Sequence, residues 1–243
     1  HEGWRLAWRA PLRLKTTGRQ PKLAKFLGID AGTTSLKAAL FDPEGHLLAI
    51  DRQEYQLLTP SPSMVELNAE TYWQACCRAV RNVTRQSDTD SEEIAALCIS
   101  SQGETLIPVD DEGIPLRNAI VWLDNRAVEE TASINGQFGA ETIYHVTGQP
   151  EVAPTWPACK ILWIKRNEPE VLARAAKFLL VEDYLLHRLT GQFVTEYCIQ
   201  TSSLLVDIQN KVWWEPMFDF GGMSPDRLAQ LMEPGEVVGP LSK

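Results

Sequence analysis

The segment KFLGIDAGTTSLKAALFD (25–42) constrains the fold more than any other part of the sequence. Two apolar runs flank a short turn of small residues, which is the pattern of a β-hairpin. Asp30 stands near the end of the first run, and Gly32 stands in the turn, where glycine permits a positive φ and lets a ligand approach the backbone. A third apolar run, HLLAIDRQEY (46–55), follows the turn DPEG, so residues 25–55 are predicted to form an antiparallel meander.

The rest of the chain alternates helical and strand-like patterns. Asn68 is a good N-cap for a helix over about 69–86, and IAALCIS (94–100) is typical of a strand buried on both faces. TPSPS (59–63) is expected to be a loop, and QFVTEY (192–197) a small hairpin arm. A strand and turn are predicted over LIPVDDEGIPL (106–116), further strands over 119–124 and 177–181, and further helices over about 126–138, 158–166 and 182–191. This order predicts an α/β domain with a mixed sheet flanked by helices.

The charge distribution narrows the class of partner. The formal net charge is −9, and residues 1–25 hold seven basic residues and one acidic residue. The remainder therefore has 16 basic and 31 acidic residues, a balance of −15. Such an acidic body repels phosphate, so no nucleic-acid partner is expected. Charges interrupt every apolar run, so no membrane partner is expected either.

The cysteines indicate a reducing compartment. Five occur without C-x-x-C spacing, an odd number that favours neither a disulfide framework nor a zinc site. Cys98 and Cys159 stand among apolar residues and are predicted to be small core residues. We therefore expect a cytoplasmic location.

The first 24 residues, HEGWRLAWRAPLRLKTTGRQPKLA, are basic and show no clean periodicity. An arginine-rich transit peptide has this composition. A non-native or disordered leader, such as a vector remnant or translated upstream bases, has it too and is the favoured interpretation. The fold is expected to begin near Lys25.

The turn after Asp30 suits phosphate. Thr33, Thr34 and Ser35 offer backbone N–H groups and hydroxyls, and Lys37 on the outgoing run adds a cation. Phosphate would repel the aspartate unless Mg²⁺ lay between them, held through water. The pattern alone leaves open an ordinary hairpin with an Asp–Gly-type turn.

Four segments in order resemble the FGGY carbohydrate kinases, a family within the actin-like ATPase superfamily. GIDAGTTSLKAALFD (28–42) resembles its first phosphate motif. GETLIPVDDEGIPLRNAIVWLDNRA (103–127) ends in a similar W-x-D-x-R-type sequence. TWPACKILWIKRNEP (155–169) resembles the lysine–tryptophan helix, and LLVEDYLLHRLTGQFVTEY (179–197) resembles the D-Y-L segment. The resemblance implies a ribonuclease H-like N-terminal, sugar-binding domain over residues 25–243.

The resemblance also implies a cofactor and a substrate class. ATP and Mg²⁺ would bind at the turn, with Asp30 facing the metal and Gly32, Thr33, Thr34, Ser35 and Lys37 around the phosphates. The substrate would be a small-molecule sugar or polyol, most of all a pentulose such as xylulose. The full-length form leaves room for a homodimer. A chaperone-type ATPase is disfavoured by the later sugar-kinase motifs.

The sugar-facing residues are carried over from the same motifs. Glu104, beside Gln102 and Gly103, would accept hydrogen bonds from sugar hydroxyls, although a solvated loop acid is the alternative. Gly103 replaces the arginine with which glycerol kinases grip glycerol, and the Met-His-Gly of many xylulokinases is also missing. Trp122 would wall the carbon chain, or serve as a core tryptophan, or both.

The remaining motif residues have mixed roles. Asp124 is grouped with the substrate residues, although pairing with Arg126 to order the loop is the favoured role. Thr155 and Trp156 stand where the family closes its pocket with an aromatic ring, a role that Trp156 would take. Two further interpretations are structural: the Lys160 stem covers Trp163, and His46, His145 and His187, which show no metal-ligand spacing, serve the structure.

The family's catalytic aspartate, a general base in a G-D-N-type segment, has no counterpart in this sequence. It is expected beyond Lys243, together with the C-terminal ATP-binding domain. The chain is thus interpreted as the N-terminal part of a kinase that is inactive alone. The alternative is a stand-alone, non-catalytic sugar-binding or regulatory module.

Overall fold

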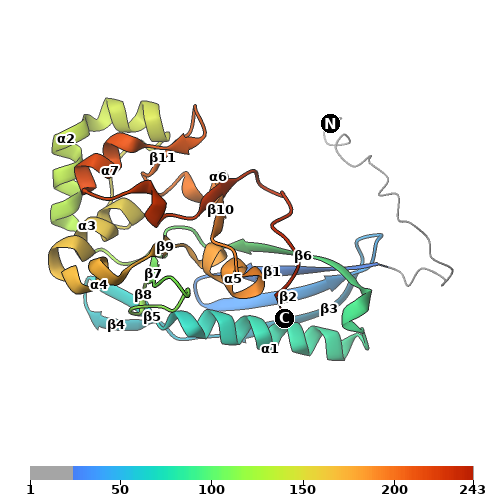
Figure 1. The fold of residues 1–243 in the computed structure, drawn as a ribbon. Coiled ribbons are helices and arrows are strands. Elements are labelled where there is room, and N and C mark those ends of the chain that lie inside the picture. Colours follow the sequence, from blue (N-terminus) through green and yellow to red (C-terminus); the bar gives the residue numbers. More distant parts are fainter. Residues whose placement is uncertain (1–23, 243) are drawn as a thin grey trace, which may run out of the picture.

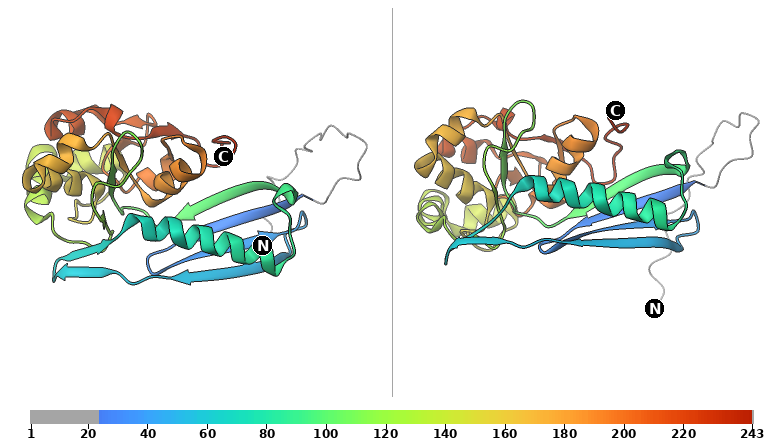
Figure 2. Two further views of the ribbon diagram at one scale, coloured as in Figure 1. Left: turned by 60° about the horizontal axis from the view of Figure 1, so that its bottom comes forward. Right: turned by 90° about the horizontal axis from the view of Figure 1, so that it is seen from below.

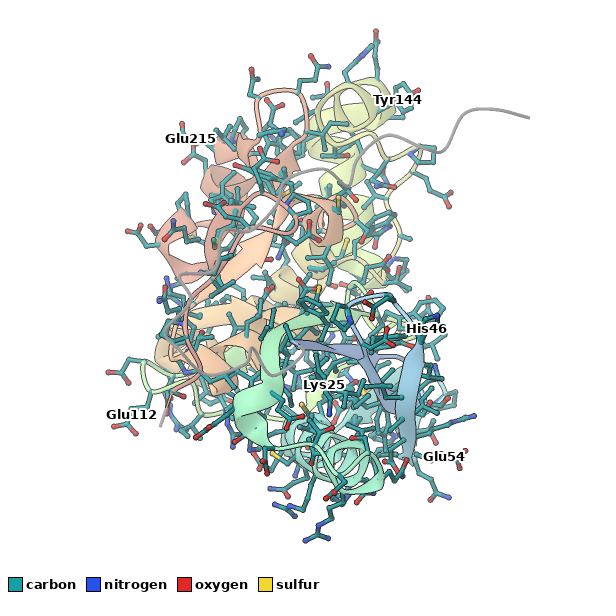
Figure 3. The ribbon with its side chains drawn as sticks, turned by 90° about the vertical axis from the view of Figure 1, so that its right-hand side faces the viewer. Lys25, His46, Glu54, Glu112, Tyr144 and Glu215 are labelled. Atoms are coloured by element: carbon teal, nitrogen blue, oxygen red, sulfur yellow. The ribbon has the colours of Figure 1, made fainter. Side chains whose placement is uncertain are left out.

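The computed structural model describes residues 24–242, as an α/β domain in which helices gather at one end of a sheet (Figure 1). The leader expected over residues 1–24 therefore lies, apart from Ala24, outside the described residues. Figure 3 shows the two portions from the side, with Lys25, His46 and Glu54 on the sheet portion and Tyr144 and Glu215 on the helical portion.

The main sheet is mixed. Strands β1 (Lys25–Ala31), β2 (Ser35–Phe41) and β3 (Leu47–Glu54) pair antiparallel, as the meander predicts. Strand β6 (Ile94–Ser101) pairs with β1 in parallel, which gives the order β3-β2-β1-β6. Helix α1 (Ala69–Gln86) packs along β2 and β3 and connects this antiparallel half to β6 (Figure 2). The predicted mixed sheet with flanking helices is confirmed.

Helix α1 forms where its sequence pattern predicts. The Asn68 side chain accepts a hydrogen bond from the Glu70 backbone N–H, which satisfies one of the free donors at the helix start. Tyr72, Ala75 and Ala79 lie on the face that is buried against the sheet. Each fully buried large apolar side chain at this interface stabilises the fold by about 1.5–3 kcal/mol relative to an exposed one.

A second apolar cluster lies in the helical portion. It is built by helices α2 (Val128–Thr147), α3 (Pro157–Asn167), α4 (Pro169–Arg174) and α7 (Glu215–Gly221). Helix α2 breaks at Gly139, whose φ is 72°, so the predicted helix end near residue 138 is confirmed and a further short helical segment follows it.

Helix α5 and the small strands complete the domain. Helix α5 (Val181–Thr190) ends at Gly191, whose φ of 75° is the left-handed conformation that glycine favours, as predicted. Four short strands form an antiparallel and a parallel pair: β7 (Ile107–Val109) with β9 (Lys177–Leu179), and β10 (Val194–Glu196) with β13 (Gln230–Met232). The other small elements are β11 (Val206–Asp207), β12 (Val212–Trp213), α6 (Tyr197–Gln200), η1 (Ser91–Glu93) and η2 (Pro225–Arg227).

Three local predictions are wrong. The expected loop TPSPS contains a hairpin, β4 (Leu58–Ser61) and β5 (Met64–Leu67), because one proline sits in the tight turn and the other in an outer strand that tolerates it. Strand β8 is only Ala119–Ile120 and pairs with β5, after which the chain turns. Residues 194–196 pair in parallel with β13 and form no hairpin arm.

Burial of β6 also differs from the prediction. The strand is at the edge of its sheet, and none of its residues is buried, where burial on both faces was expected. Cys98 is exposed for this reason, whereas Cys159 is buried as predicted. Among the described residues, no helix has both the length and the apolar character needed to cross a bilayer.

The turn between β2 and β3 brings together ligating groups that the sequence analysis did not connect. Asp42, Glu44 and His46 have ligand atoms within 4.8 Å of one another. The Asp42 carboxylate already accepts from the backbone N–H groups of Glu44 and His46, and its other oxygen lies 2.9 Å from Nδ1 of His46. These bonds serve to fix the turn.

Candidate functional site

The phosphate-type turn lies between β1 and β2. Asp30 is the penultimate residue of β1 and is paired in register with Lys37 across the hairpin. Lys37 Nζ lies 2.8 Å from Asp30 Oδ2, and the two side chains are 42% and 54% exposed. An ion pair so exposed contributes little to stability, so both charges are free to reorganise around a ligand.

Gly32 was expected to allow a positive φ in the turn, but the structure requires glycine there for a different reason. Its φ is not positive. A Cβ at this position would instead lie 3.2 Å from the carbonyl oxygen of Ser35, to which the Gly32 N–H donates a hydrogen bond of 3.0 Å. The glycine therefore permits two backbone segments to approach closely. Tyr55 holds the turn from the side, since its hydroxyl donates to the Gly32 carbonyl and its N–H donates to the Thr34 carbonyl.

Two of the three hydroxyl residues are accessible at this turn. Thr34 is exposed and Thr33 is half-buried, but Ser35 is only 5% exposed because it is the first inward-facing residue of β2. This burial corrects the expectation that the Ser35 hydroxyl would be offered to a ligand.

Trp122 links the turn to the second half of the site. Its indole N–H donates to Thr33 Oγ1 at 2.8 Å, and its backbone N–H donates to Thr105 Oγ1 at 3.1 Å. The ring is half-buried and packs against the main core. The tryptophan is therefore partly a core residue, as one interpretation expected, and it also joins the turn to the segment that follows β6.

A hollow of about 370 Å³ opens where β6 ends. Glu104 lies in its wall with φ +64°, a left-handed conformation that is uncommon for a residue with a side chain. Gly103 also lines it, and a Cβ there would come within 3.3 Å of Ser202 Oγ. The lining residues are Ser100, Ser101, Gly103, Glu104, Glu182, Glu196, Cys198, Ile199 and Ser202.

The environment of Glu104 fixes its carboxyl group. Burial raises its pKa, while the charge of Lys160 and hydrogen bonds from Ser202 and Thr155 act in the opposite direction. Thr155 thus reaches the acid of the hollow. Trp156, which was expected to close the pocket, does not line this hollow; it packs against the second core cluster, and its indole N–H has no partner among the described residues.

Lys160 supports this wall from behind and was missed as a functional residue. It is 0% exposed, and its Nζ donates to the carbonyl oxygens of Glu104, at 2.9 Å, and Val121, at 3.0 Å. Burial lowers its pKa to about 7, although the negative charges of Asp124 and Glu104 act to raise it. The only available signal in the sequence was a lysine on an otherwise apolar helix face.

Lys160 and Trp163 have separate polar partners, and packing of the lysine stem on the ring stays a prediction. The group over the Trp163 ring is the guanidinium of Arg126, 4.7 Å from the ring centroid, with that of Arg117 at 5.8 Å. Lys160 points into the site wall because its amine finds two carbonyls there.

Two other predicted substrate residues serve the framework. Asp124 is 0% exposed and accepts hydrogen bonds from the Val65 N–H and from the backbone and guanidinium of Arg126. The expected pairing is confirmed, and these bonds leave Asp124 covered and unable to reach a sugar. Gln102 donates to the Tyr72 hydroxyl at 2.8 Å and, through its backbone, to Ala31 at 2.9 Å, and it lies outside the lining of the hollow.

The mixed sheet, the phosphate-type turn and the adjoining hollow define the class. The chain superposes on the crystal structure of gluconate kinase from Lactobacillus acidophilus with a TM-score of 0.84 at 28% identity, covering 90% of this chain and 44% of that one. This match confirms the predicted ribonuclease H-like fold of the actin-like ATPases.

Sequence comparison names the family. Residues 25–243 match the FGGY family of carbohydrate kinases, N-terminal domain, and the chain belongs to this family. It is 32% identical over 219 residues to a glycerol kinase of Thermococcus gammatolerans, covering 88% of this chain and 44% of the relative. It is 34% identical over 214 residues to a xylulose kinase of Lactococcus lactis, covering 88% and 42% respectively. The chain thus spans less than half the length of these relatives.

Proposed function

We propose that this chain is the sugar-binding domain of an ATP-dependent kinase that phosphorylates a terminal hydroxyl of a sugar or polyol. The observation that carries the proposal is the hydrogen bond between Trp122 and Thr33, because it holds beside the phosphate-type turn a ring for which we propose a role in acceptor binding. Phosphoryl transfer depends mainly on positioning donor and acceptor together, and this contact supports such a site.

The turn fits a magnesium–nucleotide complex. Mg²⁺ is commonly held by one or two carboxylates together with water and substrate phosphates, and Asp30 is an exposed carboxylate at the strand end. In the proposal Asp30 holds the ion through water, Thr33 and Thr34 donate hydrogen bonds to phosphate oxygens, and Lys37 neutralises charge. A bound ion would supply positive charge that offsets the negative charge on the phosphate oxygens.

The hollow beside the turn would hold the acceptor. Glu104 would accept hydrogen bonds from sugar hydroxyls while Lys160 holds its backbone, and Trp122 would pack on the carbon chain. A pentulose such as xylulose is the proposed substrate. The general base and the adenine site would come from a C-terminal domain. The polypeptide that contains both domains is the full-length enzyme. A cytoplasmic location and a homodimer of the full-length enzyme belong to the same proposal.

The test is Asp30→Asn in the full-length enzyme. The substitution should reduce turnover by about 100-fold or more, because a charge that holds the ion is lost, while the sugar dissociation constant changes less than about twofold. Asp111→Asn, in an exposed turn, is the matched control and should leave both unchanged. Unchanged turnover in Asp30→Asn would contradict the metal assignment, and no sugar-dependent ADP release by the parent enzyme would refute the function.

A further inference from the structure

We propose that the hollow at the end of β6 selects neutral polyhydroxy acceptors and rejects anionic ones such as aldonates, with Glu182 as a specificity-determining residue. This inference rests on the proposed function and goes beyond it, because a carbohydrate kinase can accept either class. It is argued from the charges, contacts and origin of the residues that line the hollow.

Among the residues that the structure describes, three carboxylates and no basic side chain line the hollow. Glu104 comes from the segment after β6, Glu182 from the first turn of α5, and Glu196 from the end of β10. Segments far apart in the sequence thus bring acidic groups to one cavity. Gly103, in the same wall, contributes no side chain at all.

The cation behind this wall is not available to a ligand. Lys160 is fully buried, and its amine is directed to the carbonyl oxygens of Glu104 and Val121. An anionic acceptor in the hollow would therefore meet acidic side chains without a counter-charge among the lining residues. Like charges brought together in this way discriminate strongly between ligands, on the order of 100-fold.

Of the three carboxylates that line the hollow, that of Glu182 differs from the others in its hydrogen bonding. Glu196 accepts hydrogen bonds from the N–H groups of Cys198 and Ile199, and Glu104 accepts from Ser202 and Thr155. Within residues 24–242, the carboxylate of Glu182 has no hydrogen bond or ion pair. Its oxygens are therefore the ones free to bind an acceptor.

The crowding of acids around Glu182 is consistent with this role. Burial, together with the charges of Asp183 and Glu196, raises the pKa of Glu182 to about 8. An ionised carboxylate accepts hydrogen bonds from sugar hydroxyls, and a protonated one also donates to a hydroxyl or ketose oxygen. Both forms suit a neutral polyhydroxy compound, and the ionised form repels a carboxylate.

The experiment measures kcat/KM of the full-length enzyme for xylulose, ribulose, erythritol, glycerol and gluconate at saturating Mg–ATP. We expect the best neutral acceptor to exceed gluconate by about 100-fold or more. The assays are run at pH 9, above the pKa of about 8 of Glu182, so that its carboxyl is ionised. Glu182→Gln should then reduce this ratio by about tenfold, and Glu182→Lys should reduce it further, because the substitutions remove and then reverse one charge. Glu112→Gln, on an exposed turn, is the control and should keep the parent ratio. The melting temperature of each variant checks that it is folded. If Glu182→Lys does not fold, the result for Glu182→Gln alone decides the test.

Two results would overturn the inference: gluconate used as well as the best neutral acceptor, or a ratio unaffected by Glu182→Gln. If no acceptor is phosphorylated, the proposed kinase activity fails separately. Calorimetry of the same enzyme with xylulose and gluconate then decides the selectivity, since tighter binding of gluconate contradicts it and tighter binding of xylulose supports it.

Discussion

Replacing Lys160 with methionine removes one buried amine and keeps a side chain of similar length. Two backbone carbonyls of the site wall, those of Glu104 and Val121, lose their donor. A buried polar group left without a partner costs about 1–3 kcal/mol. The substitution also removes the cost of burying an amine whose pKa is lowered to about 7. These two effects offset each other near neutral pH, so the pH dependence of stability gives the sharper test.

The sign follows from proton binding. The pKa of Lys160 is about 7 in the folded protein, against an ordinary value of 10.5. Between these values the unfolded chain binds a proton that the folded protein lacks, so this group makes stability rise with pH. The geometry agrees, because two carbonyl acceptors match the two protons of a neutral amine and leave the third proton of an ammonium unpaired. Linkage gives a gain of about 2 kcal/mol between pH 7 and pH 9.

Urea unfolding of the parent chain and of Lys160→Met at several pH values measures this gain. The difference between the two free energies of unfolding isolates Lys160, because the other titrating groups are common to both proteins. Lys165→Met is the matched control: Lys165 lies on the same helix, is exposed, and donates to the single carbonyl of Gly221. Parallel pH profiles for the parent and Lys160→Met would refute the reasoning.

Two further substitutions test contacts of the site and the fold. Trp122→Phe in the full-length enzyme keeps an aromatic ring but removes the N–H that donates to Thr33. KM for Mg–ATP should therefore rise several-fold, while the sugar dissociation constant changes less. A change confined to sugar binding would argue against a role of the Trp122–Thr33 hydrogen bond in nucleotide binding. Gly113→Ala should lower the free energy of unfolding by about 1–3 kcal/mol in urea titrations, because φ is +79° and the new Cβ would lie 2.1 Å from Nε2 of His187, whose ring stacks on Phe193. Gly45→Ala, with φ +86° and open space around it, should cost less, and equal losses would contradict the steric argument.

Local patterns in the sequence were sufficient to predict the helix over 69–86, its Asn68 cap and the β1–β2–β3 meander. Each depends on residues near one another in the chain. The hairpin over 58–67 was missed because proline usually ends a strand, and only its pairing with β8 reveals why an outer strand can carry one. The exposure of β6 depends on its place in the sheet, which no local pattern encodes.

The site was predictable in its residue types and less so in its contacts. The turn after Asp30 and the acid Glu104 stand out as motifs. The bond between Trp122 and Thr33 joins residues 89 positions apart, which no spacing rule foresees. The supporting role of Lys160 was missed because a signature residue looks the same in the sequence whether it faces a ligand or supports the residue that does.

The two halves of the site also differ in when they can form. The turn at 30–35 belongs to a meander that is complete by residue 55, so its contacts span short loops and cost little closure entropy. The hollow needs residues from 100 to 202, which meet only after the intervening chain has folded. During synthesis from the N-terminus, the phosphate-type turn can therefore be in place while most of the acceptor pocket has yet to emerge from the ribosome.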